Sequence, residues 1–241
     1  MTPVTEGPDG HRVPLTRERV LSAALQLVDA EGLDALTRRR LARELGRDAM
    51  ALYRYAPDQA ALLDGIVELV LNELELPDDG EDWQTQLRRS AHNFRQLALS
   101  HPHVVNLLLT RPAATPLGLR PLATLRPLEH FLHMLTTAGF SPSQALRINR
   151  AYVGFLYGHV LAELQDMVVN PDETDDLLRL GLNRLPAREF PLLRGLATDI
   201  ANFDGAAELD YGLDLLLAGL AAQQDEGSDT AGSDSTPGRP S

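Results

Sequence analysis

The segment from Leu36 to Tyr55, LTRRRLARELGRDAMALYRY, places one glycine between two short runs of apolar and arginine residues at helical spacing. Gly46 supplies the backbone freedom that a tight turn needs. The first run puts three apolar side chains on one helix face: Leu41, Ala42 and Leu45. The second run is expected to return three inward: Met50, Leu52 and Tyr53. Ala42 is small enough for two helices to cross there, so the segment predicts a helix-turn-helix.

The same segment is basic in an acidic chain. The whole chain carries a net charge of −12, whereas residues 37–54 hold six arginines (38, 39, 40, 43, 47, 54) against Glu44 and Asp48. An acidic body repels phosphate, so only this segment is suited to face DNA. Arginines on exposed helices often do no more than solvate a surface. The apolar frame around Gly46 favours DNA binding instead.

Capping residues extend the helix-turn-helix into a larger unit. Thr16 is a predicted N-cap for a helix that Gly32 ends, and Thr37 is a predicted N-cap for the next helix. Pro57 ends the second helix of the helix-turn-helix, the one expected to read DNA and called the reading helix below. Asp58 is placed to cap a connecting helix that reaches about Leu76. We therefore expect a DNA-binding domain over residues 15–58.

The remaining sequence predicts an all-α chain, because no alternating strand pattern occurs in it. A second helical domain is expected over residues 59–224, with disordered ends at 1–14 and 225–241. Its later helices are predicted near 81–100, 103–110, 119–138, 142–168, 172–183 and 205–223. The absence of cysteine excludes disulfides and thiolate metal sites. No apolar run is long enough to span a bilayer and no signal core is seen, so a cytoplasmic protein is expected.

The stretch from Leu15 to Leu71, with its AxxLxxxxGxxxLTxRxLAxxLG frame and its Leu52-Tyr53 pair, resembles the TetR family of bacterial transcriptional repressors. The later half is similar to the tetracycline-repressor branch at Trp83, Phe94 and the terminal FDGAAELDYGLDLLLAGL. The resemblance implies a ligand-responsive repressor that binds a palindromic DNA operator as a homodimer.

The resemblance also implies which residues meet DNA. Arg39 matches a position that reaches a base edge, whereas Thr37, Arg38 and Tyr53 match phosphate contacts. This chain departs from the branch at the start of the reading helix, where three residues replace Gln, Pro and Thr: Ala49, Met50 and Ala51. Gln59 replaces a lysine. Thymine-methyl contacts or reading by Arg47 and Arg54 would have to compensate, and the remaining expected DNA contact is Tyr55.

The effector implied by the resemblance is not a metal–tetracycline complex. The positions that hold metal ligands in the branch read Val105-Asn106-Leu107-Leu108 and Val160-Leu161-Ala162 here, with Glu163 one position off. Neither a metal nor another cofactor is expected. The expected ligand is a small, largely apolar molecule such as a polyketide or drug, held by Phe94, Leu97, Asn106, Leu108, Arg111, His130, Phe131, Met134, Phe155 and His159. Each of these residues is also a candidate for ordinary core packing.

Two long apolar helices are candidates for a dimer interface. Helix 142–168 carries one broad stripe, and helix 205–223 carries another, made of Leu209, Leu213, Leu216, Leu217 and Leu220. Either stripe could pack within one chain. The resemblance implies that the two helices pair with their symmetry mates.

Two other functions compete with a DNA-binding regulator. Asp172-Glu173-x-Asp175-Asp176 resembles the Mg-diphosphate motif of all-helical terpenoid enzymes. Acids are also favoured at a helix start by the helix dipole, and no second acidic motif accompanies them. A helical protein-interaction module is the other alternative. The basic helix-turn-helix favours the regulator over both.

Overall fold

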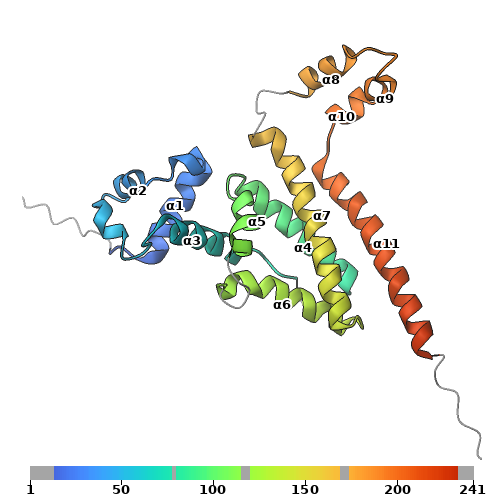
Figure 1. Ribbon diagram of the computed structural model, residues 1–241, viewed down its shortest axis with the longest axis horizontal. Helices are drawn as coiled ribbons and strands as arrows, with labels where there is room; N and C mark the ends of the chain where they lie inside the picture. Colours follow the sequence, from blue (N-terminus) through green and yellow to red (C-terminus); the bar gives the residue numbers. More distant parts are fainter. Residues whose placement is uncertain (1–13, 78–79, 115–119, 169–173, 233–241) are drawn as a thin grey trace, which may run out of the picture. The chain divides into compact units, whose positions relative to one another are not determined.

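The computed structural model describes residues 14–77, 80–114, 120–168 and 174–232, and every regular element in these ranges is helical (Figure 1). Two compact units divide the chain, residues 1–69 and 70–241. The expected N-terminal arm lies outside the described residues up to residue 13. The all-α prediction is confirmed for the described ranges.

The first unit contains α1 (Arg17–Glu31), η1 (Leu33–Ala35), α2 (Arg38–Glu44), η2 (Ala49–Leu52) and most of α3 (Gln59–Asn72). The predicted caps are confirmed: Thr16 accepts from the amide of Arg19, Thr37 from Arg40 and Asp58 from Ala61. The two predicted turn glycines are confirmed as well. Gly32 has φ 81° and Gly46 has φ 60°, values that side chains other than glycine rarely adopt.

The second helix of the predicted helix-turn-helix is shorter than expected. Only Ala49–Leu52 is helical, as a 3₁₀ turn that Asp48 caps through the amide of Met50. Only Leu52 points inward: it is buried, whereas Met50 is 73% exposed and Tyr53 49% exposed. The inward placement of Met50 and Tyr53 was therefore wrong. An isolated segment this short between Asp48 and Pro57 cannot sustain many α-helical hydrogen bonds, and its side chains follow the tighter 3₁₀ period.

The boundary between the units falls inside α3, later than the expected boundary at residue 58. Leu62 and Ile66 are buried, and a Cβ built on Gly65 would lie 2.5 Å from Cδ2 of Leu21 in α1. The first turns of α3 therefore pack closely on α1. They belong to the core of the first unit.

The second unit contains the last residues of α3 and all later helices: α4 (Trp83–Ser100), α5 (Val105–Ala114), α6 (Leu122–Thr137), α7 (Pro142–Val168), α8 (Asp175–Asn183), α9 (Pro191–Gly195), α10 (Ala197–Ala201) and α11 (Gly205–Gly232). The sequence did not predict α9 and α10, which are single short turns. Among the expected acids, Asp172 and Glu173 lie outside the described residues.

The expected disordered tail from residue 225 needs correction, because α11 continues to Gly232. Each further residue of a helix adds a hydrogen bond once the helix is nucleated, and no proline interrupts the chain before Pro237. Residues 233–241 lie outside the described part of the chain. α5 likewise continues beyond the predicted end near residue 110, through Pro112 to Ala114.

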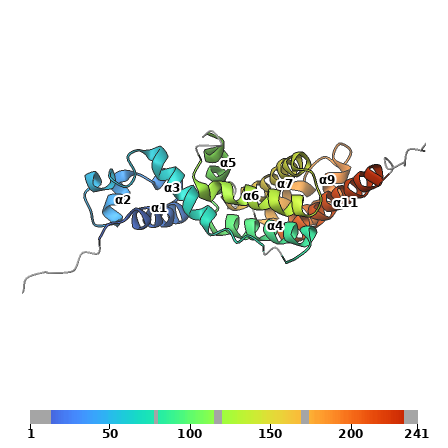
Figure 2. The same ribbon diagram turned by 90° about the horizontal axis from the view of Figure 1, so that it is seen from below.

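α7 contacts α4, α6 and α11 and lies between them (Figure 1, Figure 2). It buries one stripe at helical spacing, consisting of Ala145, Ile148, Tyr152, Leu156, Val160 and Leu164. The leucine stripe of α11 is also buried within the protomer, at Leu209, Leu213, Leu217 and Leu220. The sequence allowed these stripes to pack within one chain or to pair with a second copy. Packing within one chain is confirmed for these residues.

A buried ion pair joins α4 to α7 beside the start of α11. Arg95 Nε donates to Glu163 Oε2 at 2.8 Å, and the two side chains are 13% and 11% exposed. The hydrogen bond from Glu163 raises the pKa of Arg95, so the guanidinium stays charged. His159 donates from Nε2 to the carbonyl of Gly205, 2.8 Å away, and a Cβ on Gly205 would overlap the Glu163 carboxylate. This cluster fixes the position at which α11 begins.

We expect Glu163→Gln to destabilise the protein by about 2 to 4 kcal/mol, because it leaves Arg95 charged and unpaired in a largely buried position. The control is Asp176→Asn, which breaks the exposed Arg179–Asp176 pair and should change stability by less than about 1 kcal/mol. Thermal unfolding at one fixed protein concentration measures both changes. Equal effects of the two substitutions would contradict a structural role for the Arg95–Glu163 pair.

Candidate DNA-binding surface and ligand chamber

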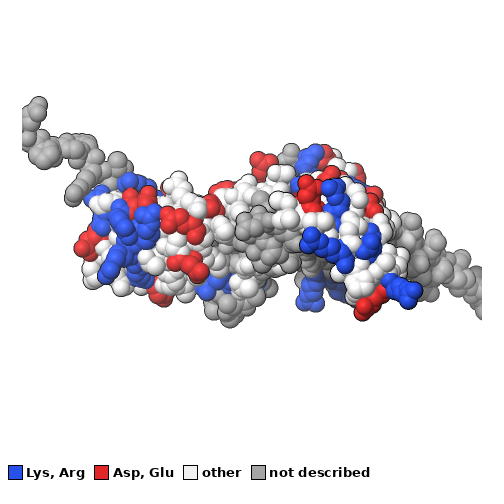
Figure 3. All heavy atoms as spheres, turned by 90° about the horizontal axis from the view of Figure 1, so that it is seen from above, with Lys and Arg blue, Asp and Glu red and all other residues white. Residues whose placement is uncertain are grey.

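An arginine-rich surface covers the helix-turn-helix of the first unit. Figure 3 shows Lys and Arg atoms, all of them arginine in this chain, gathered in a band over this unit. Arg39, Arg43 and Arg54 are exposed there, and Arg47 is half-buried. Arg40 differs from them because it pairs with Glu31 at 2.6 Å and with Glu44 at 3.3 Å. These ion pairs bind Arg40 to its own unit, so the sequence count of six arginines overstates the free positive charge.

Two of the expected phosphate contacts are stacked on each other. The guanidinium carbon of Arg38 lies 4.1 Å from the centre of the Tyr53 ring, within the range of a cation–π contact. Arg38 Nη1 is buried and has no hydrogen-bond partner in the described part of the chain. Thr37, beside Arg38 at the start of α2, is exposed although its hydroxyl oxygen caps the helix. The stack holds the Arg38 side chain in place.

The expected base-reading residues lie on the outer side of the same unit. Arg39, Met50, Ala51 and Arg54 are exposed, and Ala49 is half-buried. Met50 is the largest apolar side chain exposed on η2. An exposed thioether at this place offers apolar contact and no hydrogen bond.

Two expected DNA contacts make internal hydrogen bonds. The Tyr55 hydroxyl donates to the carbonyl of Leu15 at 2.6 Å, and the Gln59 amide donates to the carbonyl of Leu36 at 3.2 Å. Both side chains therefore hold the first unit together. Each of them uses one hydrogen-bond donor within the unit.

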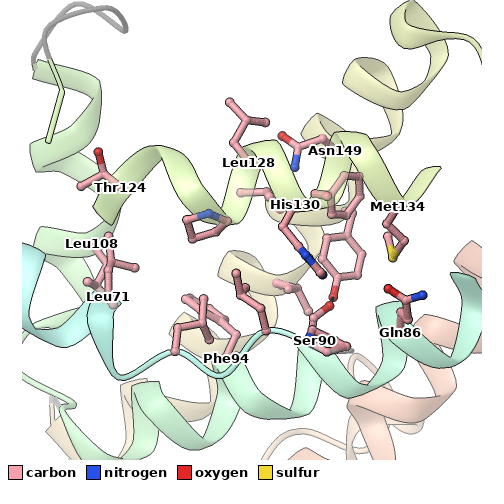
Figure 4. Close-up of a pocket in the computed structure, with 18 of the residues that line it drawn as sticks. Leu71, Gln86, Ser90, Phe94, Leu108, Thr124, Leu128, His130, Met134 and Asn149 are labelled. Carbon is pink, nitrogen blue, oxygen red and sulfur yellow. Dashed lines mark hydrogen bonds between the residues drawn. The ribbon is translucent and has the colours of Figure 1, made fainter. Parts of the chain in front are cut away.

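A ligand-sized chamber of about 320 Å³ lies in the second unit between the end of α3, α4, α5, α6 and α7 (Figure 4). Five expected ligand residues line it: Phe94, Leu108, His130, Phe131 and Met134. Further aromatic walls come from Tyr152 and Tyr157 of α7, and Leu71 and Leu74 close one end. The Phe94 and Tyr157 rings meet edge to face at 5.1 Å. The chamber is thus largely apolar and lined by rings.

The other five expected ligand residues do not line the chamber. Leu97 is buried in the core, Asn106 is exposed and Arg111 is half-buried. Phe155 lies against Gly212 of α11, where a Cβ would be 2.4 Å from its ring, and His159 bonds to Gly205. Phe155 and His159 of α7 therefore face α11, whereas Tyr152 and Leu156 line the chamber.

The chamber also contains a buried hydroxyl network, which was not predicted from the sequence. The Tyr152 hydroxyl donates to the carbonyl of Leu87 at 2.7 Å and lies 2.6 Å from Oγ of Ser90. Burial raises the pKa of Tyr152 well above its usual value, so the phenol stays protonated. A tyrosine inside the apolar stripe of α7 is the sequence signal for such a network, because a buried hydroxyl needs a partner.

Two polar side chains of the chamber have unsatisfied atoms. Gln86 is only 5% exposed, and its Oε1 has no hydrogen-bond partner among the described residues. Nε2 of His130 is also buried and without a partner there. Figure 4 shows His130 reaching from α6 toward Ser90 of α4. A buried polar atom without a partner costs free energy, which a bound ligand could recover.

Family models match both units of the chain. Residues 20–66 match the model described as bacterial regulatory proteins, tetR family, and residues 76–224 match the tetracyclin repressor-like C-terminal domain. The chain belongs to the tetR family. It is therefore a member of a family of ligand-responsive transcriptional repressors, and the helix-turn-helix prediction is confirmed at that level.

Individual relatives agree with the family assignment. The tetracycline repressor protein class D of Escherichia coli is 32% identical over 219 residues, which cover 87% of this chain and 90% of the relative. An HTH-type transcriptional regulator of Saccharopolyspora erythraea is 31% identical and covers 86% of this chain and 85% of the relative. The structure of the TetR family protein ActR of Streptomyces coelicolor in complex with actinorhodin has a TM-score of 0.72 at 29% identity, covering 88% and 99% of the two chains.

We expect Arg39→Ala to weaken binding to a specific operator by about 1 to 3 kcal/mol and to weaken binding to random DNA much less. Arg39 is exposed at the start of α2 and has no internal ion pair that the structure records. The measurement is fluorescence anisotropy with DNA that flanks the gene of this protein, against a scrambled duplex. Arg188→Ala, which removes one exposed positive charge from the second unit, is the control. Equal losses on both duplexes would mean that Arg39 contacts phosphate only.

Proposed function

We propose that this tetR-family protein represses transcription from a palindromic operator and leaves the DNA when an aromatic, polyketide-like effector fills the chamber. The observation that supports this most is that Leu71 lines the chamber and belongs to α3, the helix that starts at Gln59 directly after the reading element. A ligand that favours one position of the last turn of α3 would bias the helix as a whole. The protein would then have two states, one that binds the operator and one that does not. Only a ligand with different affinities for these two states can shift the balance between them.

The walls of the chamber favour a ring system as the effector. Four aromatic side chains line it: Phe94, Phe131, Tyr152 and Tyr157. The polar side chains in its walls are Gln86, Ser90, Arg120, Thr124, His130 and Asn149. Its volume of about 320 Å³ suits a molecule of drug size. The related ActR protein binds actinorhodin in its solved complex, which supports an aromatic polyketide as the class of ligand here.

Binding of this effector would need no metal. Glu163, the acid nearest to the metal-ligand position of the tetracycline branch, pairs with Arg95 and does not line the chamber. The described residues contain no group of three side chains suited to hold a metal ion. Metal chelation would require Glu163 to leave Arg95 unpaired, which is costly.

At the operator, we propose separate roles for the exposed residues of the first unit. Arg39 and Arg54 would read base edges, with Met50 and Ala51 against thymine methyl groups. Arg38, held by Tyr53, would bind phosphate together with Thr37 and Arg47. Tyr55 and Gln59 would stabilise the unit through their hydrogen bonds to Leu15 and Leu36. Such a division predicts few hydrogen bonds to bases and hence an operator unlike that of the tetracycline repressors.

Proteins of this family are dimeric, and one face of α7 and α11 remains open for a partner copy. On α7 the face consists of exposed small residues, Ala151, Gly154, Gly158 and Ala162, and a Cβ at either glycine would meet nothing within 4 Å. On α11 it consists of Tyr211, Leu215, Ala218 and Ala222, all exposed. Small residues let helices approach closely, and Leu215 and Tyr211 supply apolar area. We therefore place the homodimer interface here.

Leu215→Asp should give a monomer, because it would bury an unpaired charge at the interface. Leu215 is 62% exposed in the protomer, so the substitution leaves the protomer core intact. Leu122→Asp is the matched control, since Leu122 is 71% exposed at the start of α6. Light scattering after size exclusion should report monomer for the first variant and dimer for the control. A dimer in both would place the interface elsewhere.

The proposal includes no catalytic step and places the protein in the cytoplasm, where bacterial DNA lies. In the acidic segment that resembles an enzyme motif, Asp176 pairs with Arg179, and both are on the surface. No helix in the described part of the chain is long and apolar enough to cross a membrane.

Release from the operator should be insensitive to chelators. With an uncharged anthracene that carries a propyl chain as the probe ligand, we expect the protein to dissociate from the DNA flanking its gene equally well with and without EDTA. Phe131→Ala should raise the probe concentration needed by about tenfold or more, because a lost ring contact of a few kcal/mol shifts the equilibrium by that much. Operator affinity without probe should change little, since Phe131 lies in the second unit. Loss of release with EDTA, or an unchanged dose response in Phe131→Ala, would contradict the proposed effector site.

A further inference from the structure

A second cavity of about 250 Å³ adjoins the ligand chamber at the N-terminal end of α4. Glu81, Asp82 and Trp83 line it from one side, and His133 and Thr137 of α6 line it from the other. Gln86 and Met134 line both cavities. Figure 4 shows these two side chains at one end of the chamber, opposite Leu71, Leu108 and Thr124. The two spaces therefore meet at Gln86 and Met134.

Unsatisfied acceptors are concentrated at this junction. The amide nitrogen of Gln86 donates to the carbonyl of Glu81 at 2.7 Å, which fixes the orientation of the amide. Its Oε1 is then left without a partner in the described part of the chain, as is the buried Oε2 of Glu81. Glu81 Oε1 is already bound by Arg89 at 2.5 Å. Both free atoms accept hydrogen bonds and cannot donate them.

The small cavity is also negatively charged. Glu81 and Asp82 both contribute carboxylates, and Arg89 pairs with the first of them. The Asp82 carboxylate caps α4 by accepting from the amides of Gln84 and Thr85. Its hydrogen bond from the Thr85 hydroxyl holds the pKa of Asp82 below its usual value, so it remains ionised. Arg89 therefore balances the charge of Glu81, and the charge of Asp82 remains.

The walls of the small cavity are held in place from outside. The Trp83 ring meets the Phe140 ring edge to face, with centres 5.4 Å apart. The side chain of Gln224 in α11 donates to the carbonyl of Ala138 at 2.6 Å. The acceptors are consequently presented by a fixed frame, which lowers the cost of ordering them around a ligand.

We propose that the small cavity is a second compartment of the effector site and binds a protonated amine carried on the ring system that fills the chamber. The inference rests on the proposed effector function of the chamber. An ammonium group offers three donors and no acceptor, and its charge opposes the carboxylates. A neutral apolar substituent would leave Gln86 and Glu81 unsatisfied, and an acidic one would be repelled. The effector is thus an amine-bearing aromatic molecule.

The test uses three fluorescent probes of equal ring size: anthracene with an aminopropyl chain, with a propyl chain and with a carboxyethyl chain. Each probe is titrated into the full-length protein at neutral pH. The dissociation constant of the aminopropyl probe is then compared with those of the propyl and carboxyethyl probes. The aminopropyl probe should bind about tenfold or more tightly than the propyl probe, and the carboxyethyl probe most weakly. Glu81→Gln and Gln86→Met should each bring the amine preference to within about twofold.

Glu129→Gln is the matched control, because it makes the same charge change on the exposed side of α6 and should keep the preference. Thermal unfolding verifies that each variant is folded. Equal binding of the amine and propyl probes, or an unchanged ratio in Glu81→Gln, would overturn the second compartment alone, since the chamber would still bind the ring. Failure of all three probes to bind the wild-type protein would overturn the effector site with it.

Discussion

The second unit depends on a single requirement, that α7 bury its apolar stripe against three other helices at once. Its residues from Ala145 to Leu164 pack against α4, α6 and α11. The polar groups that enter this packing must be paired, which Arg95–Glu163 and Tyr152–Ser90 accomplish. A cavity remains among the rings that these helices contribute, where Phe94 meets Tyr157 and Phe131 lies 5.2 Å from Tyr152. The chamber is therefore a product of how α7 is packed.

Local features of the fold could be predicted from the sequence, because each depends on a few adjacent residues. The caps at Thr16, Thr37 and Asp58 and the turn at Gly46 belong to this group. The ligand residues could be predicted only in part. Phe94 and Phe131 line the chamber while Phe155 and His159 face α11, and the sequence alone does not say which side of α7 meets which helix. The second helix of the helix-turn-helix is also shorter than predicted. The sequence shows a helical period there, but it does not show that only the turn Ala49–Leu52 forms.

The binding groups of the chamber share a physical property that sequence patterns do not reveal. Gln86 and His130 are polar residues within helices whose apolar periodicity is strong, and each keeps a buried atom without a partner among the described residues. Such atoms lower the stability of the protein unless a ligand pairs with them. Such a loss of stability is typical of functional sites. There, a buried polar atom can lack a hydrogen bond within the protein because a bound ligand supplies one. Glu81 and Gln86 extend the same property beyond the apolar chamber.

The position of Leu71 has a thermodynamic consequence for the operator. Leu71 lines the chamber and lies on the same helix as Gln59, and in the proposed mechanism the effector and the DNA both act on this helix. Coupling between two ligands is reciprocal: operator DNA must weaken effector binding by the same factor by which the effector weakens operator binding. Protein that is bound to DNA is thus less sensitive to the effector than free protein. A cell with more copies of the operator would need more effector to reach the same transcriptional response.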